Sequence, residues 1–338
     1  MTQTVGYEPM RTGFADWVHD VRNVMADSPK QGLLLGAYYT YVGANLTVTS
    51  RWADGTSIYD REWDALIVLD ACRVDALRAI ADEFDFVEDV NSIRSVGSTS
   101  GEWMVQTFDR RNEAAIEQTA MVTANVHSGV VLWDRLFPPQ YVAAPVTWPA
   151  WNPVDPESFA LLDEVWDDQW DAVAGTVAPR SVTDRAIAAG RAGGFDRLIV
   201  HYLQPHAPYI EVDEAGEVST VYREPLKSLQ RGELSAETAW EAYLDTLRVV
   251  LEEIGLLLDN LDAERVILTA DHGEAFGELG FYEHPVCCPH PVVRRVPWVE
   301  TTACDRDRHQ PPQRVRTDEQ TDERTTVGEQ LEALGYVS

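Results

Sequence analysis

The sequence predicts an α/β fold, a three-layer αβα sandwich with a mostly parallel central sheet. Three short apolar runs, residues 65–69, 197–203 and 266–269, are long enough for buried strands and too short for helices. Residues 238–261 have the spacing of an amphipathic helix and lead into the third run. Helix and strand therefore alternate along the chain, which is typical of a layered α/β protein.

The first run ends at an acidic residue. Residues 65–69 are apolar throughout, as in a central parallel strand, and Asp70 follows directly. A helix is expected after it, to about residue 81, and an Asp here can serve as its N-cap. Ligands bind at the carboxyl ends of strands in open α/β sheets, so Asp70 is also a candidate ligand.

The third run, residues 266–269, ends in an acid, an imidazole and a glycine. Asp271 and His272 sit at the mouth of this strand, and Gly273 lets the backbone turn away. A hard oxygen beside an imidazole suits manganese, zinc or a similar divalent ion. An Asp-His pair alone is also common in a strand-end turn. His284, twelve residues after His272, is a further candidate.

Residues 95–103 form a Ser/Gly-rich segment that leads into a predicted helix. Thr99 or Ser100 can act as the N-cap of that helix. Alternatively, a hydroxyl at this place can act as a nucleophile, because the helix dipole and free amides stabilise a developing oxyanion. The residues themselves leave Ser98, Thr99 and Ser100 open as candidates.

The second run, residues 197–203, leads into Gln204-Pro205-His206. His201 falls inside the predicted strand, and we expect it to be a hydrogen-bonded core histidine. His206 follows the strand and is a site candidate.

The charge balance is strongly acidic. The chain has 338 residues, with 56 acidic and 27 basic side chains, a net charge of −29 and only two lysines, Lys30 and Lys227. Because 45% of the residues are hydrophobic, the composition indicates a folded domain with a highly hydrated acidic surface, as halophiles use. We expect a salt-loving, archaeal host. Such a surface repels nucleic acid, which is therefore excluded as a partner.

Cysteine usage and hydropathy indicate a cytoplasmic protein. The four cysteines include the adjacent pair Cys287-Cys288, a poor framework for disulfides, so reduced thiols are expected. The first twenty residues lack a basic region followed by an apolar core, so no signal peptide is expected. Residues 32–49 are moderately apolar but contain Tyr, Asn and Thr, and we expect a buried or packed surface without an integral membrane segment.

Five short patches, in order, resemble the sulfatase branch of the alkaline phosphatase superfamily. These are LIVLDACRVDAL from residue 66, SVGSTS from residue 95, QPHAPY from residue 204, ADHGE with its later histidine from residue 270, and LEALGY from residue 331. The resemblance extends from about residue 64 to the end. It implies an alkaline phosphatase-like sandwich, and it places the nucleophile at Ser100, with Thr99 as the alternative.

Three departures from the family pattern narrow the expected chemistry. The Cys-x-Pro-Ser-Arg signature, whose Cys becomes formylglycine, is missing, so sulfate hydrolysis through formylglycine is not expected. Ala71 stands where many sulfatases have a second Asp, and Gln204 where Asp is usual. Ala71 argues against a four-carboxylate calcium site and fits relatives that bind Mn or Zn, such as phosphonate monoester hydrolases. Gln204 removes a ligand of a second metal ion and so favours a single metal ion.

The resemblance implies a metal-dependent hydrolase of sulfate, phosphate or phosphonate esters. Asp70, Asp271, His272 and Ser100 would hold one divalent ion (Mn, Zn, Ca or Mg). His206 and His284 would bind the transferred group or protonate the leaving oxygen. The expected partner is a small anionic ester or a glycan.

Two other functions stay open. One is transfer of a phospho-group in surface-glycan or lipid modification. The other is a catalytically inactive protein used for binding or scaffolding. The oligomeric state is not predicted.

The expected organisation is an N-terminal extension, residues 1–60, packed on a catalytic domain, residues 61–338. Residues 125–195 and 205–237 are expected as loop and helix insertions, and residues 305–325 as a mobile acidic segment.

Overall fold

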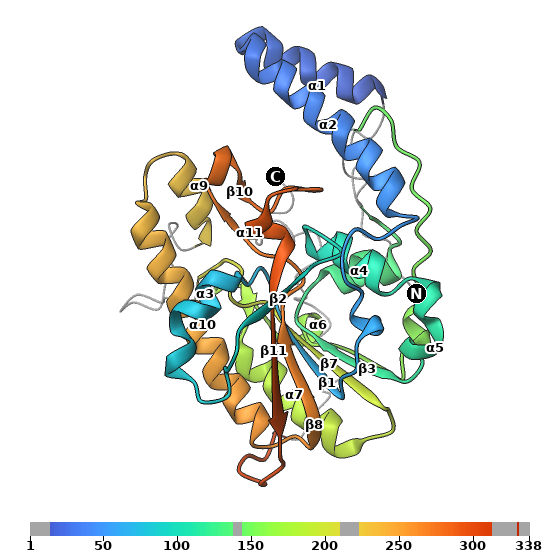
Figure 1. Cartoon of the computed structure of the whole chain (residues 1–338), viewed down its shortest axis with the longest axis vertical. Helices are drawn as coiled ribbons and strands as arrows, with labels where there is room; N and C mark the ends of the chain where they lie inside the picture. Colours follow the sequence, from blue (N-terminus) through green and yellow to red (C-terminus); the bar gives the residue numbers. More distant parts are fainter. Residues whose placement is uncertain (1–13, 138–143, 210–222, 313–329, 331–338) are drawn as a thin grey trace.

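The computed structural model describes residues 14–137, 144–209, 223–312 and Gln330. Seven strands form one sheet in the order β2-β11-β8-β1-β7-β3-β4 (Figure 1). The five strands from β8 to β4 run parallel, while β11 is antiparallel to both β8 and β2. The predicted mostly parallel sheet is therefore confirmed. The strands are β1 (Ala65–Leu69), β2 (Asn91–Arg94), β3 (Thr119–Thr123), β4 (Leu161–Glu164), β7 (Arg197–Tyr202), β8 (Ala263–Thr269) and β11 (Arg295–Ala303).

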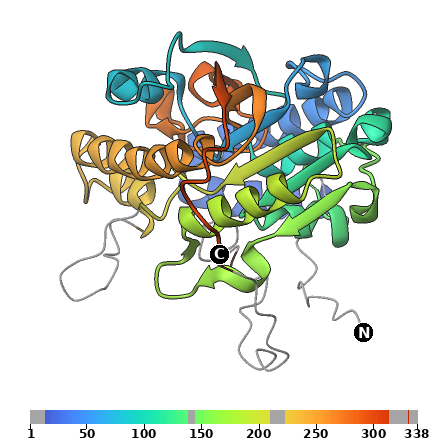
Figure 2. The same cartoon turned by 90° about the horizontal axis from the view of Figure 1, so that it is seen from below.

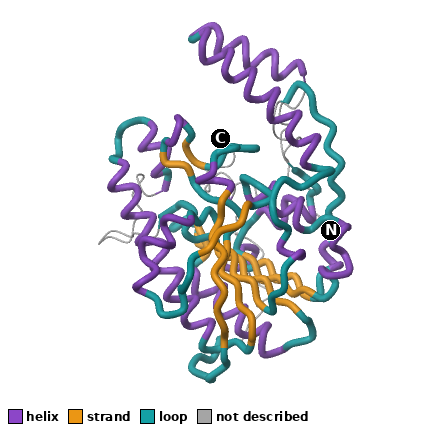
Figure 3. Tube along the Cα trace, viewed as in Figure 1, coloured by secondary structure: helices purple, strands orange, loops and turns teal. Residues whose placement is uncertain are grey.

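Helices lie on both faces of this sheet (Figure 2), and Figure 3 shows them around the strands. Two short ribbons, β5–β6 and β9–β10, lie outside the sheet. Their strands are β5 (Trp170–Asp171), β6 (Thr176–Val177), β9 (Ala275–Phe276) and β10 (Tyr282–Glu283). The helices are α1 (Phe14–Asp27), α2 (Pro29–Thr49), α3 (Val74–Ile80), α4 (Ser100–Thr107), α5 (Glu113–Ile116), α6 (Trp166–Gln169), α7 (Pro179–Ala192), α9 (Pro225–Gln230), α10 (Ala236–Leu258) and α11 (Pro291–Arg294).

The burial of strand β1 on both faces shows why the fold has three layers, with helices on each side of the sheet. Its side chains alternate between the two faces of the sheet, and every one is buried because both faces are covered. Ile67 and Leu69 belong to a core cluster completed by α3, α7 and α10. Leu66 and Val68 belong to a second cluster, completed by α4, α5 and the C-terminal half of α2. The all-apolar sequence of β1 is thus what a central strand needs.

The structure differs from the sequence predictions in three elements. Residues 290–299 are an apolar run for which the sequence predicts a strand, but the run begins with the short helix α11, so the strand starts at Arg295 and continues to Ala303. Within residues 125–195, strand β4 joins the central sheet, which the sequence did not predict. The acidic segment from residue 305 is anchored in its first part, where Asp305 pairs with Arg191 and His309 with Asp184. Most of residues 313–338, including the LEALGY patch, lies outside the described residues.

Helices α1 and α2 form a hairpin at the end of the molecule to which the parallel strands point (Figure 1). Val42 and Leu46 of α2 are buried against the body, whereas α1 has no buried residue. The prediction of a buried or packed surface for residues 32–49 holds for one side of α2 and is wrong for the other, where Leu33 and Leu34 are exposed. Among the described residues, no helix has the length and apolarity needed to span a bilayer.

Candidate active site

Two carboxylates meet where β1 and β8 end. Asp70 directly follows β1, and Asp271 follows β8 by two residues. Because the strands are parallel neighbours, with Val68 opposite Thr269, the residues after them lie at the same edge of the sheet. Asp70, Asp271 and His272 each offer a ligand atom within 4.8 Å of the others, and all three are buried. These three predicted metal ligands, called the first cluster below, are therefore brought together.

Ser100 faces the first cluster from the first residue of α4. Its hydroxyl donates to Asp271 Oδ2 at 2.7 Å and lies 3.3 Å from His272 Nε2 and 3.5 Å from Asp70 Oδ1. The first N–H groups of a helix have no partner within it, so they favour negative charge near this oxygen. Ser100 thus has the surroundings of a nucleophile and of a fourth metal ligand.

The two neighbouring hydroxyls are used elsewhere. Thr99 is the N-cap of α4, and its side chain accepts from the backbone N–H of Glu102 at 3.1 Å. The Ser98 hydroxyl contacts the Glu102 carboxylate and the carbonyl of Pro285. Of the three candidates from the sequence, Ser100 alone has a hydrogen bond to the first cluster among the contacts of the described residues.

Asn125 is a site residue that sequence reasoning missed. It lies two residues after β3, and its Nδ2 donates to Asp70 Oδ2 at 2.7 Å and to Ser100 Oγ at 3.0 Å. The backbone N–H of His127 donates to its Oδ1, which fixes the orientation of the amide. The available signal was an asparagine just after an apolar run, the same pattern that pointed to Asp70.

The electrostatics of the first cluster favour a cation. Burial, with the carboxylates of Asp271 and Glu274, raises the pKa of Asp70 well above its ordinary value. Burial also acts to raise the pKa of Asp271, but His272 and other neighbours bring it below its ordinary value. Within the described residues, neither carboxylate pairs with a lysine or arginine. Since buried carboxylates need a partner charge or a metal, two carboxylates and one imidazole fit a divalent ion such as manganese or zinc.

A second cluster adjoins the first. His206, Glu274 and His284 each offer a ligand atom within 4.8 Å of the others. His284 Nδ1 lies 3.1 Å from Glu274 Oε1, and the ring centroids of His284 and His272 are 4.4 Å apart. The sequence predicted both histidines as catalytic and gave Glu274 no role. The glutamate could have been found from its place directly after His272-Gly273.

The two histidines of the second cluster are neutral at pH 7. Burial lowers the pKa of both His206 and His284 to about 4, and burial raises the pKa of Glu274 to about 7. A neutral imidazole can bind a metal or donate one N–H, but it lacks the second proton that a general acid gives up. Glu274, with a pKa near neutrality, is therefore the better placed proton donor of the three.

Arg73, which lies in the LIVLDACRVDAL patch, holds the segment that carries Glu274. Its guanidinium pairs with Asp75 and Glu278, both at 2.7 Å, and donates to the carbonyl of Glu274 at 3.1 Å. It also lies over the rings of Trp240 and Phe276. A buried arginine with this many partners fixes the second cluster relative to α3.

Two further residues are placed by the structure. Gln204 points away from the site, because its Nε2 donates to Thr176 Oγ1 and to the carbonyl of Val177. His201 lies buried in β7, as predicted, with its ring against Trp103. Neither ring nitrogen of His201 has a hydrogen-bond partner among the described residues, so the prediction of a satisfied core histidine is wrong in that respect.

The structure therefore brings a serine hydroxyl at a helix N-terminus together with carboxylate and imidazole groups at the ends of parallel strands, and these groups could hold a divalent metal ion. Solved structures similar to this chain include sulfatases, phosphoethanolamine transferases and a lipoteichoic acid synthase, and the sulfatases among them are the group that the sequence patches resemble. The sequence itself matches no model of a known protein family, and no curated protein sequence is significantly similar to it.

Three of these structures give the extent of the likeness. The soluble domain of lipooligosaccharide phosphoethanolamine transferase A from Neisseria meningitidis is 17% identical, with a TM-score of 0.45, over 71% of this chain and 75% of that chain. The integral membrane form of that transferase is 15% identical, with a TM-score of 0.44, over 86% of this chain and 60% of that one. A putative sulfatase from Bacteroides thetaiotaomicron is 10% identical, with a TM-score of 0.40, over 71% of this chain and 64% of that chain. The likeness concerns the fold.

Proposed function

We propose that this protein cleaves phosphate, phosphonate or sulfate esters through a covalent intermediate on Ser100. The observation that carries the proposal is the position of the Ser100 hydroxyl at the N-terminus of α4, 2.7 Å from Asp271 Oδ2 and within 3.5 Å of Asp70 Oδ1. Asp70, Asp271, His272 and Ser100 would hold one divalent ion. When bound, such an ion lowers the pKa of a ligating hydroxyl and neutralises charge on the ester oxygens.

The residues of this chain divide the work as follows. Asp271 Oδ2 accepts the Ser100 hydrogen bond and orients the oxygen toward the ester. Ser100 passes its hydroxyl proton to Asp271 Oδ2, and its Oγ bonds to phosphorus or sulfur while the ester P–O or S–O bond breaks. The leaving oxygen takes a proton. Glu274 is suited to supply that proton because its pKa is about 7. The neutral His206 and His284 are suited to contact the non-bridging oxygens of the transferred group.

The intermediate can be resolved by water or by another hydroxyl group, which separates hydrolysis from the transferase function. The test uses aryl phosphate, phosphonate, phosphodiester and sulfate substrates with Mn, Zn, Mg or Ca at high salt. We expect turnover by the wild type, none by Ser100→Ala, and an adduct on the Ser100 peptide by mass spectrometry. Ser98→Ala is the matched control. Turnover that survives Ser100→Ala would refute the proposal.

Product analysis then decides between the two acceptors. With glycerol or a sugar added, free phosphate or sulfate indicates hydrolysis, and a modified alcohol indicates transfer. A wild-type protein that binds none of the four metals and turns over no substrate would instead favour the binding or scaffold function.

A further inference from the structure

The exposed apolar side chains of this protein gather on one part of its surface. Of the thirteen large hydrophobic residues that are exposed in the described chain, nine lie on α1, on α2 or its following turn, or in the loop at residues 144–148 beside α2. The remaining four are scattered over other elements. Scattered exposed hydrophobics are ordinary on any protein, whereas a contiguous group indicates an interaction surface.

Helix α2 presents these residues as a continuous stripe. Six exposed residues recur at helical spacing and therefore share one side of the helix. We call them the apolar ridge: Leu33, Leu34, Ala37, Tyr41, Ala44 and Val48. From Leu33 to Val48 the ridge is about 22 Å long at the rise of an α-helix. Its most exposed member is Leu33, at 68%.

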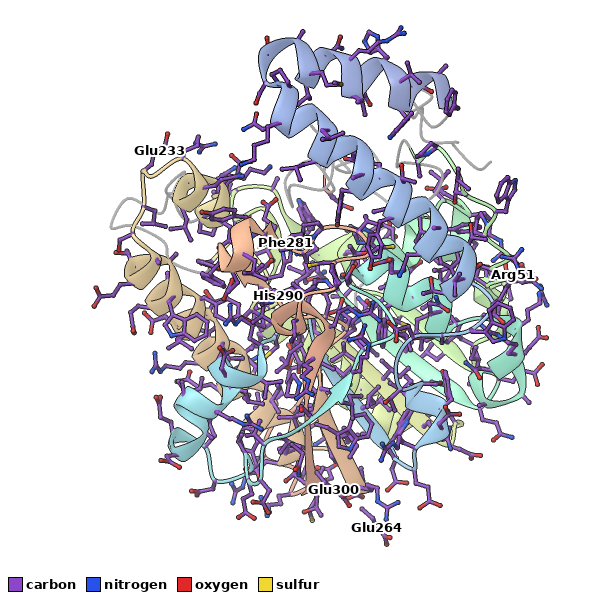
Figure 4. The ribbon with its side chains drawn as sticks, turned by 45° about the horizontal axis from the view of Figure 1, so that its top comes forward. Arg51, Glu233, Glu264, Phe281, His290 and Glu300 are labelled. Carbon is purple, nitrogen blue, oxygen red and sulfur yellow. The ribbon has the colours of Figure 1, made fainter. Side chains whose placement is uncertain are left out.

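Two exposed tryptophans lie at the C-terminal end of α2. Trp52 follows the helix and is 70% exposed. Trp148 is 66% exposed, and its backbone N–H donates to Thr47 Oγ1 of the helix at 2.8 Å. Arg51 donates to the carbonyl of Trp148, and Figure 4 labels it at this end of α2. Tryptophan and tyrosine beside an apolar helix face are typical of segments that lie in the boundary of a lipid layer.

The charge distribution separates this ridge from the rest of the surface. Residues 31–50 contain no charged side chain, although the chain carries 56 acidic residues and a net charge of −29. The uncharged stretch is bounded by two basic residues, Lys30 and Arg51. A second copy of a chain with this net charge would be repelled, whereas a zwitterionic lipid surface carries no net charge and does not repel it.

We propose that the apolar ridge of α2 docks this protein onto the surface of a lipid bilayer. The helix would lie along the boundary between head groups and acyl chains, with Leu33, Leu34 and Val48 buried in the layer. The area of these side chains then leaves water, which supplies the attraction. Because the attraction is apolar, it should persist at high salt.

The ridge is also joined to the active-site side of the molecule. The Tyr41 hydroxyl, in the ridge, donates to the carbonyl of Cys287 at 3.2 Å, and that of the adjacent Tyr38 donates to the carbonyl of Val286 at 2.7 Å. Both carbonyls lie in the segment that follows His284. Resting on the proposed function, this arrangement would hold the site beside a lipid layer, where it could act on esters carried by lipids.

Vesicle co-sedimentation tests the docking without any activity measurement. The full chain is mixed with phosphatidylcholine vesicles at low and high salt. We expect the wild type to sediment with vesicles in both, and Leu33→Gln/Leu34→Gln to bind at least about tenfold more weakly, because two leucines no longer leave water. The matched control is Leu161→Gln/Val173→Gln, which changes two exposed apolar residues away from α2 and should bind as the wild type does.

Three results would overturn the proposal. The first is a wild type that stays in the supernatant at every vesicle concentration. The second is a ridge variant that binds as tightly as the wild type. The third is a wild type that forms a dimer in light scattering without vesicles while the ridge variant is a monomer, which would assign the ridge to a second copy. Circular dichroism of each variant, with retained helix signal, shows that it is folded.

Discussion

The two clusters at the carboxyl edge of the sheet differ in how the chain holds them. Asp70 and Asp271 follow neighbouring parallel strands, and Ser100 begins a helix packed on the same sheet. The second cluster instead comes from segments between elements, with His206 after β7 and His284 after β10. Its position depends on loop contacts such as those of Arg73.

Under the proposed function, this difference predicts a division of roles between the two clusters. Groups at strand ends and a helix start are held most firmly, as a nucleophile and its metal ligands require. Groups on loops can adjust to the shape of a substrate. We therefore expect changes in the first cluster to abolish chemistry, and changes in the second to reduce it.

The largest effect is expected for the first cluster. Asp271→Asn should lower kcat/KM by at least about 10³-fold, because it removes both a proposed metal ligand and the charged acceptor of the Ser100 hydrogen bond. Its Oδ1 can still accept from the N–H groups of Ala71 and His272, so the fold should survive. Steady-state kinetics measure kcat/KM, and denaturant unfolding of the metal-free protein measures the stability of the fold. Activity near that of the wild type would show that the site lies elsewhere.

The second cluster should give a smaller loss. His284→Gln keeps one hydrogen-bonding group near Glu274 and should cost about 10- to 100-fold in kcat/KM. The same assay checks it, with His290→Gln as a control on a nearby histidine outside both clusters. A loss as large as that of Asp271→Asn would remove the distinction between the clusters.

Acid should destabilise the protein through a histidine beside the first cluster. Burial lowers the pKa of His127 from 6.5 to about 3, so below pH 6.5 the unfolded chain binds a proton that the folded chain does not. Stability is therefore lost as pH falls from about 6.5, by roughly 2 kcal/mol at pH 5 for this group. Urea unfolding of metal-free protein at pH 7 and pH 5 measures it.

The control for this pH effect is a matched pair of variants. His127→Gln should remove that part of the fall in unfolding free energy, whereas the exposed His19→Gln should leave it unchanged. If the free energy of unfolding falls equally with pH in His127→Gln and in the wild type, the pKa of His127 does not differ between the folded and unfolded states.

Glu102 connects the nucleophile segment with the segment after His284. Its carboxylate accepts from the backbone N–H of Ser98 at 2.9 Å and of Cys287 at 3.2 Å. Glu102→Gln should lower kcat about tenfold through misplacement of Ser100, because an amide offers one acceptor oxygen where two are used. KM should change little, and the exposed Glu237→Gln is the control. A raised KM with normal kcat would argue against positioning of the nucleophile.

The smallest effect is expected for Thr99. Thr99→Ala removes the N-cap of α4 and should lower the free energy of unfolding by about 1 kcal/mol, while Thr99→Ser should restore it. Activity should stay within a few-fold of the wild type. If Thr99→Ala abolished turnover and Ser100→Ala did not, the roles of the two hydroxyls would be exchanged.

Much of the site could be predicted from the sequence. Asp70, Asp271 and His272 stand directly after apolar runs, and a run of that length has few options except a buried strand. Local order along the chain was enough to place these groups at strand ends. The patches around Ser100 and His206 completed the candidate set through their resemblance to one family.

The tertiary structure alone decided which side chains meet. Asn125, Glu274 and Glu102 acquire roles from contacts across large sequence separations, such as the 55 residues between Asn125 and Asp70. No local pattern encodes a distance of that kind. The same holds for α2, whose uncharged sequence suits either burial or exposure. Only the packing of the body against one side of the helix determined that the other side, with Leu33 and Val48, faces outward.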